Sequence, residues 1–230
     1  DSYNWKQRMV RSLVIIFTLF SGSFFVQSDQ KPTLTIRDIH GKLQTPLIAK
    51  GKRPSVLFFI THDCPVANKL APEIRRIIEG YRAKAQFTLV YVDPEMTVAE
   101  VTTHQKDYNY TKLNTIHDRQ HKLVQATGAT ITPEVVVTES NGHIVYRGRI
   151  NNFYGDFGKP RRVVTQHDLR DALDALLAGK PVPKRTASAV SMPSVIASCV
   201  VDWYNWIEQP AVAPGNGGDI SFLAAGTLAL

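Results

Sequence analysis

Short apolar runs alternate with amphipathic segments along most of this sequence, and this order constrains the fold more than any other feature. Residues 56–60 and 87–92 are continuous apolar runs, which are typical of strands buried on both faces of a sheet. Residues 65–81 repeat apolar side chains every three or four positions, as an amphipathic helix does, and residues 97–108 begin with a Thr-x-x-Glu capping box. Strands that alternate with helices in this way indicate parallel strands in a central sheet covered on both faces.

The second half of the chain adds antiparallel strands. An Asn-Gly dipeptide separates two β-branched runs, residues 133–138 and 143–150, and this dipeptide is a strong signal for a tight β-hairpin. Residues 165–177 predict a final helix. We therefore expect an α/β fold with a mixed central sheet, closed by a C-terminal β-hairpin and a helix. Shorter elements are expected as strands at 33–39 and 114–117 and as a helix at 119–127.

The two ends of the chain differ in character from the middle. Basic residues precede an apolar run at 13–26, which is shorter than the roughly 20 residues that span a bilayer, so residues 1–28 are predicted to be a cleaved signal peptide. Residues 29–179 are expected to form the folded domain. Residues 180–230 are predicted to be a linker and an irregular tail, for which a shifted reading frame is one explanation. A signal peptide implies a periplasmic or extracellular protein that meets a membrane only during export.

The composition is typical of a globular protein with a basic surface. Apolar residues make up 43% of the chain and charged residues 20%, which suits a chain with a buried core. The net charge of +7 raises the question of nucleic acid. The densest basic cluster, Lys159-Pro160-Arg161-Arg162, is short, however, and no aromatic residues interleave with Lys and Arg as a stacking groove requires. We therefore expect a solvated basic face and no nucleic-acid partner.

Cys64 stands where a buried strand is expected to end and the longest helix to begin. Reactive groups collect at the C-terminal edge of parallel strands. The helix N-terminus adds unpaired backbone N–H groups and a partial positive charge, and both stabilise a thiolate, the attacking species in disulfide exchange and peroxide reduction. This position predicts a redox role for Cys64, which a protonated His62 favours and the neighbouring Asp63 opposes. The alternative is a buried, inert cysteine.

These residues resemble the thioredoxin-like superfamily. The segment CPVANKLAP, from Cys64 to Pro72, is similar to the thioredoxin active-site helix, with its nucleophilic cysteine and internal proline. The segment ATITPEVVV resembles the loop with a cis-proline before the hairpin, and Thr132-Pro133 is the expected cis bond. Together with THDCPVANKLAPEI and VYRGRINNFYGDFGK, these motifs resemble exported bacterial redoxin-domain proteins of the peroxiredoxin-type (alkyl hydroperoxide reductase/thiol-specific antioxidant) group. The resemblance implies a thioredoxin-like three-layer sandwich over roughly residues 33–177.

The resemblance also implies roles for individual residues. Cys64 would be the catalytic nucleophile, and Thr61 would contact a peroxide as part of a Thr-x-x-Cys motif. Arg147 and Arg149 are the candidates for the arginine that holds the peroxide in peroxiredoxins. The residues expected to shape the substrate groove are Pro65, Thr132 and Pro133.

The sequence departs from thioredoxins at the second cysteine of the Cys-x-x-Cys motif, where Ala67 stands. Cys64 therefore has no resolving partner in its own helix. The chain has one other cysteine, Cys199, and either this thiol or an external thiol reductant would resolve Cys64.

Three functions remain open from the sequence. The first is an exported thiol oxidoreductase with an antioxidant role, whose substrates are a thiol or disulfide protein or a peroxide. The second is a non-catalytic module that binds a partner through the same groove. The third, a metal site at His62, Asp63 and Cys64, lacks the paired cysteines that such sites use in this fold, so we expect no metal and no cofactor.

Other polar residues are given structural interpretations. The histidines elsewhere in the chain are interpreted as surface or capping residues. The polar stretch after the hairpin is interpreted as a solvated exit, and two aspartates as acids favoured by a helix dipole. The histidines are His104, His117, His121, His143 and His167, the polar stretch contains Asn151, Asn152 and Tyr154, and the aspartates are Asp168 and Asp171.

Overall fold

The computed structural model describes residues 34–156 and 159–189. The chain divides into two compact units, Asp1–Pro32 and Thr33–Leu230, and every described residue belongs to the second. The predicted signal peptide, most of the predicted tail and Cys199 lie outside the described residues. Within the described ranges, no helix has both the length and the apolar character needed to cross a membrane.

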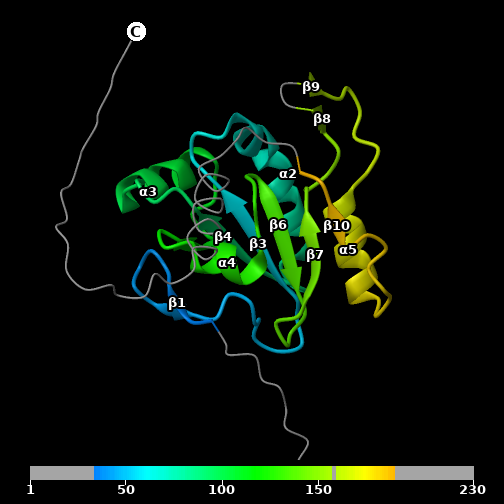
Figure 1. Cartoon of the computed structure of the whole chain (residues 1–230), viewed down its shortest axis with the longest axis horizontal. Helices are drawn as coiled ribbons and strands as arrows, with labels where there is room; N and C mark the ends of the chain where they lie inside the picture. Colours follow the sequence, from blue (N-terminus) through cyan, green and yellow to red (C-terminus); the bar gives the residue numbers. More distant parts are fainter. Residues whose placement is uncertain (1–33, 157–158, 190–230) are drawn as a thin grey trace, which may run out of the picture. The chain divides into compact units, whose positions relative to one another are not determined.

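A six-stranded mixed sheet with the strand order β10-β7-β6-β3-β4-β5 forms the centre of the second unit (Figure 1). Strand β6 is antiparallel to both of its neighbours, whereas the other adjacent pairs are parallel, so five of the six strands point the same way. The mixed sheet and the closing hairpin β6–β7 are therefore confirmed. The strands are β3 (Ser55–Ile60), β4 (Gln86–Tyr91), β5 (Asn114–His117), β6 (Glu134–Thr138), β7 (Ile144–Gly148) and β10 (Thr186–Ala187).

Helices cover both faces of this sheet, and the core is divided accordingly. Alternate side chains of a strand point to opposite faces. Phe58 therefore lies in a cluster with apolar residues of α2, α3 and α5, and Phe59 lies in a second cluster with those of α4. The helices are α2 (Pro65–Tyr81), α3 (Val98–Asp107), α4 (Lys122–Thr127) and α5 (Asp168–Leu177). These three layers confirm the predicted thioredoxin-like sandwich.

Two small antiparallel ribbons lie outside the central sheet. Strands β1 (Ile36–Arg37) and β2 (Leu43–Gln44) form one ribbon before β3. Strands β8 (Tyr154–Asp156) and β9 (Lys159–Pro160) form the other, in the connection between β7 and α5. The β8–β9 ribbon is an addition that the sequence does not predict.

Strand β10 comes from the segment predicted to be a linker and pairs with β7. Gly148 makes this pairing possible: its φ is 150°, and a Cβ atom there would lie 2.0 Å from the carbonyl oxygen of Ala187. The backbone N–H groups of Arg147 and Arg149 donate to the carbonyls of Arg185 and Ala187 at 2.9 and 3.1 Å. The pairing covers the β7 edge of the sheet, which would otherwise expose unpaired backbone groups.

Two helices begin three residues later than the sequence predicts, because side chains bind the backbone before them. The Asp118 carboxylate accepts N–H groups of Leu123 and Val124 at 2.8 and 3.1 Å, so the chain turns before α4 begins. Before α5, the Asn152 side-chain oxygen accepts the N–H groups of Thr165 and Gln166, both at 3.0 Å.

Candidate active site

Strand direction brings several loops to one edge of the sheet. Strands β3, β4, β5, β7 and β10 end at this edge, and β6 begins there. The loop that carries Cys64 after β3 therefore lies beside the loop that carries Pro133 before β6, and the segment after β7 follows the same edge (Figure 1). The predicted site residues Thr61, Cys64, Pro65, Thr132 and Pro133 are brought together here.

Cys64 is the N-cap residue of α2, with extended backbone angles of φ −73° and ψ 108°. The backbone N–H of Ala67 donates to its sulfur at 3.4 Å, and the thiol donates to the Thr132 carbonyl oxygen at 3.6 Å. The residue is 5% exposed. A thiolate at this position would keep the N–H donor and the favourable end of the helix dipole, and would lose only the weak bond to Thr132.

The Thr132–Pro133 peptide bond is cis, as predicted. Thr132 is fully buried, and its hydroxyl oxygen has no hydrogen-bond partner among the described residues. Thr61 is buried at the end of β3. A small hollow opens to the surface beside this loop. It is lined by Val66, Leu70, Pro133, Arg149, Ile150, Asn151, Tyr154 and Ala189.

A chain of uncharged side chains holds the loop before Cys64. Asn68 donates its side-chain N–H to the His62 carbonyl at 2.8 Å, so its side-chain oxygen faces His104 and accepts from Nε2 at 2.9 Å. His104 Nδ1 is then the acceptor for the Tyr91 hydroxyl, at 2.7 Å. The carbonyl fixes the direction of every bond, because it can only accept. We call Tyr91, His104 and Asn68 the neutral chain.

The neutral chain stays uncharged because His104 is difficult to protonate. Burial, with a smaller contribution from the positive charge of a protonated His62, lowers the pKa of His104 to about 4. The ring also contacts Tyr91, Tyr108 and Tyr110 at centroid distances of 5.5, 4.5 and 6.3 Å. The prediction of a surface or capping histidine is therefore wrong for His104, because its position faces the core from α3. Its spacing of three residues from the buried Val101 is the sequence signal that could have indicated this.

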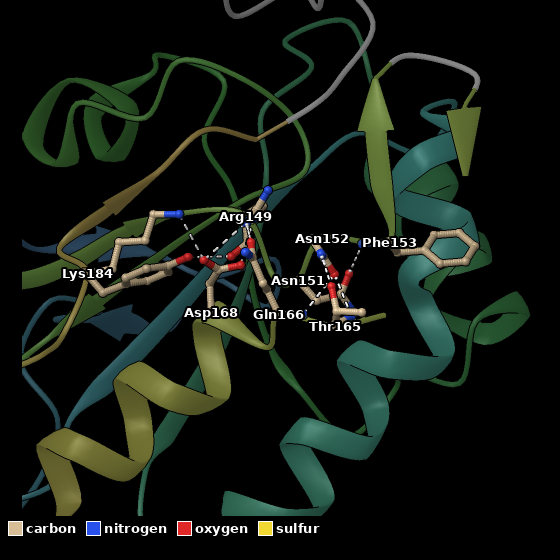
Figure 2. A network of polar contacts seen from close by, with 9 residues as sticks. Arg149, Asn151, Asn152, Phe153, Thr165, Gln166, Asp168 and Lys184 are labelled. Atoms are coloured by element: carbon tan, nitrogen blue, oxygen red, sulfur yellow. Dashed lines mark hydrogen bonds and ion pairs between the residues drawn. The ribbon is translucent and has the colours of Figure 1, made fainter. Parts of the chain in front are cut away.

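A charged network holds the other side of the site (Figure 2). Arg149 Nε donates to the Asp168 carboxylate at 2.7 Å, Lys184 Nζ donates to it at 3.3 Å, and the Arg149 guanidinium also donates to Gln166. Burial alone would raise the pKa of Asp168, but the bonds and charges of Arg149 and then Lys184 outweigh it and lower that pKa. We call Arg149, Asp168 and Lys184 the charged network; it joins β7, α5 and the segment before β10.

The segment after β7 is pinned at Asn152. The Asn152 side chain donates to the Thr165 hydroxyl at 2.8 Å and accepts two backbone N–H groups, while its own backbone N–H donates to the Gln166 carbonyl (Figure 2). Residues 153–156 and 159–164 lie between the two ends of this neck, and we call them the arm. The expectation of a solvated hairpin exit is wrong for Asn151 and Asn152, which are 7% and 4% exposed because their side chains satisfy the backbone of this neck.

The two arginine candidates do not both belong to the site. Arg147 pairs in register with Val136, whose side chain lies in the cluster under α4, and its guanidinium donates to the carbonyls of Thr127 and Gly128. It therefore lies on the opposite face of the sheet from Cys64. Arg149 lines the hollow, but its guanidinium binds Asp168.

Sequence reasoning missed the residues that hold the site together. Asn68 lies four residues after Cys64, and neither this spacing nor the apolar periodicity of α2 distinguishes it from a surface residue. Asp168 was interpreted only as a helix-dipole acid, although it is buried with two basic partners. Within residues 34–156 and 159–189, no group of three or more His, Cys, Asp or Glu residues is arranged to hold a metal ion.

Comparisons with known proteins agree with this architecture. The AhpC/TSA family model matches residues 28–147, a range that includes Cys64 and Pro133. No curated protein matches the chain. The crystal structure of an uncharacterized conserved protein from Geobacillus kaustophilus matches with a TM-score of 0.60 and 24% identity, over 72% of this chain and 92% of that one. A hypothetical protein from Sinorhizobium meliloti 1021 matches with a TM-score of 0.59 and 23% identity, over 69% and 87%. The family match extends over more than half of the sequence, so this chain belongs to the AhpC/TSA family of thioredoxin-like redoxin proteins.

Proposed function

We propose that this chain is an exported thiol oxidoreductase that exchanges disulfides, with Cys64 as the cysteine that attacks the substrate. The observation that carries the proposal is the placement of the Cys64 sulfur. It caps α2, receives the Ala67 N–H, and lies 3.6 Å from the carbonyl of the residue before the cis-proline. A thiolate is stabilised by the first two features.

In the proposed reaction, the Cys64 thiolate attacks one sulfur of a partner disulfide. A new S–S bond forms to Cys64 while the partner's S–S bond breaks, and the second partner sulfur leaves as a thiolate that takes a proton from solvent. An external thiolate that then attacks the partner's sulfur in the mixed disulfide releases Cys64 as a thiolate. If Cys199 attacks the Cys64 sulfur instead, the partner leaves as a thiolate and a Cys64–Cys199 disulfide forms, which an external thiol reductant reduces. The number of disulfides is unchanged, so no separate oxidant is needed.

Resolution requires a thiol from outside α2. The position three residues after Cys64 is Ala67, which is buried and cannot attack the mixed disulfide. Two thiols remain as proposals: an external reductant, and Cys199 of the same chain.

Peroxide reduction is a second candidate, supported by the family and by the buried Thr61 three residues before Cys64. In that reaction the thiolate attacks one peroxide oxygen, the O–O bond breaks, and a sulfenic acid and an alcohol or water result. The positions of Arg147 and Arg149 argue against it, since one lies on the opposite face and the other is bound to Asp168. A non-catalytic binding module remains the alternative to both.

The test is to react the reduced chain with bis(2-hydroxyethyl) disulfide, a small neutral disulfide, and to locate the adduct by mass spectrometry. We expect a mixed disulfide on Cys64 in the wild type and in Cys199→Ser, and none at this position in Cys64→Ser. If the adduct formed only on Cys199, or on neither thiol, the proposed enzyme activity would be wrong.

Three further measurements test the resolving thiol, the peroxide reaction and the export of the chain. If Cys199 resolves Cys64, the wild-type adduct converts with time to an internal disulfide, and the Cys199→Ser adduct persists until a thiol is added. Treatment with hydrogen peroxide and a sulfenic-acid trap distinguishes peroxide reduction. Export predicts that the chain produced in bacteria is found in the periplasm or medium and begins near residue 29.

A further inference from the structure

We infer that Arg161 and Arg162 on the arm bind acidic residues that flank the reacting cysteine of a protein partner. This inference rests on the proposed function, because it assigns a specificity to the same site. The arm is hydrogen-bonded at its base, carries two arginines that form no ion pair with the described residues, and borders the hollow beside the cis-proline loop.

The arm is held in one place at its base. Its neck is closed by Asn152, as described above, and Phe153 and Tyr154 pack against the core cluster that contains Cys64. Figure 2 shows the neck from close by, with Asn152 beside Thr165 and with Phe153 at the start of the arm. A surface built on such a base keeps its orientation relative to Cys64.

Two cations on the arm have no acidic partner among residues 34–156 and 159–189. The Arg161 backbone N–H donates to the Phe153 carbonyl, and its guanidinium lies over Gly155, where a Cβ atom would come within 3.2 Å of it. Arg161 and Arg162 are exposed, and neither forms an ion pair with any residue in the described part of the chain. Lys159, by contrast, is paired with Asp156 at 3.1 Å.

The arm borders the hollow that an extended partner would occupy. Tyr154 lines this hollow together with Val66, two residues after Cys64, and Pro133, the cis-proline. A polypeptide that lay along this hollow with its sulfur at Cys64 would have neighbouring residues near the arm. Acidic side chains at those positions would meet Arg161 and Arg162.

The opposite side of the site has the opposite charge. The segment between β4 and the first turn of α3 carries Asp93, Glu95 and Glu100, and Asp93 lies 3.9 Å from His62. The β4 side of the edge therefore carries three acids against Arg119, which binds the Pro94 carbonyl, and the β7 side carries Arg161 and Arg162. Such a charge separation favours one orientation of a charged partner and speeds its encounter with the site.

The experiment compares two peptide disulfides that differ only in charge, the symmetric dimers of acetyl-Glu-Glu-Cys-Gly amide and acetyl-Lys-Lys-Cys-Gly amide. Each rate of mixed-disulfide formation at Cys64 is divided by the rate with free N-acetylcysteine amide, to remove the intrinsic reactivity of the probe. We expect the acidic dimer to be favoured in the wild type. The preference should fall by roughly tenfold in the double variant Arg161→Glu, Arg162→Glu, and should weaken in 0.5 M NaCl.

A matched control reverses two lysines elsewhere. Lys50 and Lys52 are exposed and precede β3, at the opposite end of that strand from Cys64, so Lys50→Glu, Lys52→Glu makes the same change in net charge. We expect this variant to keep the wild-type preference. An equal loss in both double variants would show an effect of net charge alone and would overturn the inference. Equal rates for the two dimers in the wild type would also overturn it.

Binding without chemistry separates this inference from the proposed function. The fluorescently labelled acidic and basic peptides, with their thiols blocked, are titrated with Cys64→Ser and followed by anisotropy. If the acidic peptide binds more tightly and charge reversal of Arg161 and Arg162 removes this preference, the binding role of the arm is supported, even if Cys64 does not exchange disulfides. Equal binding of both peptides contradicts it even if Cys64 exchanges.

Discussion

The neutral chain and the charged network hold two sides of the same reactive edge by different physical means. The neutral chain connects β4, α3 and α2 and ends on the carbonyl of His62, two residues before Cys64. The charged network connects β7, α5 and the segment before β10. One is made of uncharged groups with a fixed direction of hydrogen bonding, and the other of ions that are partly exposed to water.

This difference determines how much stability each side loses when one of its groups is removed. A buried polar group that loses its partner retains the full cost of its desolvation. Ions near the surface regain water and are screened by salt, so each pair contributes less. We therefore expect the loop before Cys64 to depend more on the neutral chain than the arm side depends on the charged network.

The largest effect is expected for Asn68→Ala. The change removes the bond to the His62 carbonyl and leaves His104 Nε2 without its acceptor. We expect a loss of about 3 kcal/mol in the free energy of unfolding, measured by urea denaturation. Lys69→Ala, at the exposed neighbouring position of α2, should change it by less than about 0.5 kcal/mol. Similar losses in the two variants would show that the neutral chain does not bear on stability.

The second effect is the pH dependence that His104 imposes. Its pKa is lowered to about 4 in the folded chain, against about 6.5 when unfolded. Between these values the unfolded chain binds a proton that the folded chain does not, so stability falls as the pH falls from 6.5 towards 4. His104→Gln removes this contribution. We expect its stability deficit relative to wild type to shrink by up to about 2 kcal/mol across that window.

The measurement compares wild type and His104→Gln in one pH series. The series consists of urea denaturation curves at several pH values from 7 to 4. A constant difference between His104→Gln and wild type would contradict a neutral His104.

The smallest effect is expected for Asp168→Asn. The loss of its charge leaves Arg149 and Lys184 without an anionic partner, but Arg149 keeps its bond to Gln166 and Lys184 is about half exposed. We expect a loss of about 1 kcal/mol at low salt, which shrinks in 1 M NaCl. Asp171→Asn, in the same first turn of α5 but exposed, supplies the control for the helix dipole. A loss that is insensitive to salt would indicate packing rather than charge.

The two sides should also lose their contributions to stability in different pH ranges. The pKa of Asp168 is lowered, so its contribution is present above the ordinary aspartate value near 4 and is lost as the pH falls through the lowered value. As the pH falls, the contribution of the neutral chain is lost between pH 6.5 and 4, and that of the charged network is lost below pH 4. Both losses are measured in the same denaturation series.

The elements of the fold could be predicted because their signals are local. The apolar periodicity of α2, the Thr97–Glu100 capping box and the Asn-Gly turn each depend on a few adjacent residues, and the structure has all three. The starts of α4 and α5 were placed too early, because the side chains of Asp118 and Asn152 bind the backbone there. Strand β10 depends on a glycine in another strand, and the linker composition of its own segment gives no sign of it.

The site was predictable only as far as Cys64 and the cis-proline, since those residues belong to short motifs. The groups that hold them come from separate parts of the chain. Asn68 and His104 are 36 residues apart and Arg149 and Asp168 are 19 apart, so no local spacing relates them. Arg147 and Arg149 look equivalent in the sequence, and strand alternation alone would place both on one face. β7 ends at Gly148, whose φ is 150°, and Arg149 beyond it binds Asp168 while Arg147 binds the Gly128 carbonyl on the other face.

The most direct test of the central claim is the rate at which Cys64 is alkylated by iodoacetamide in the folded chain between pH 5 and 9, with Cys199→Ser used so that one thiol reacts. A reactive thiolate at the N-terminus of α2 predicts alkylation of the folded chain at neutral pH and below, faster than that of the same chain unfolded in urea. Alkylation that occurred only after unfolding would identify Cys64 as an inert core residue and would contradict the account.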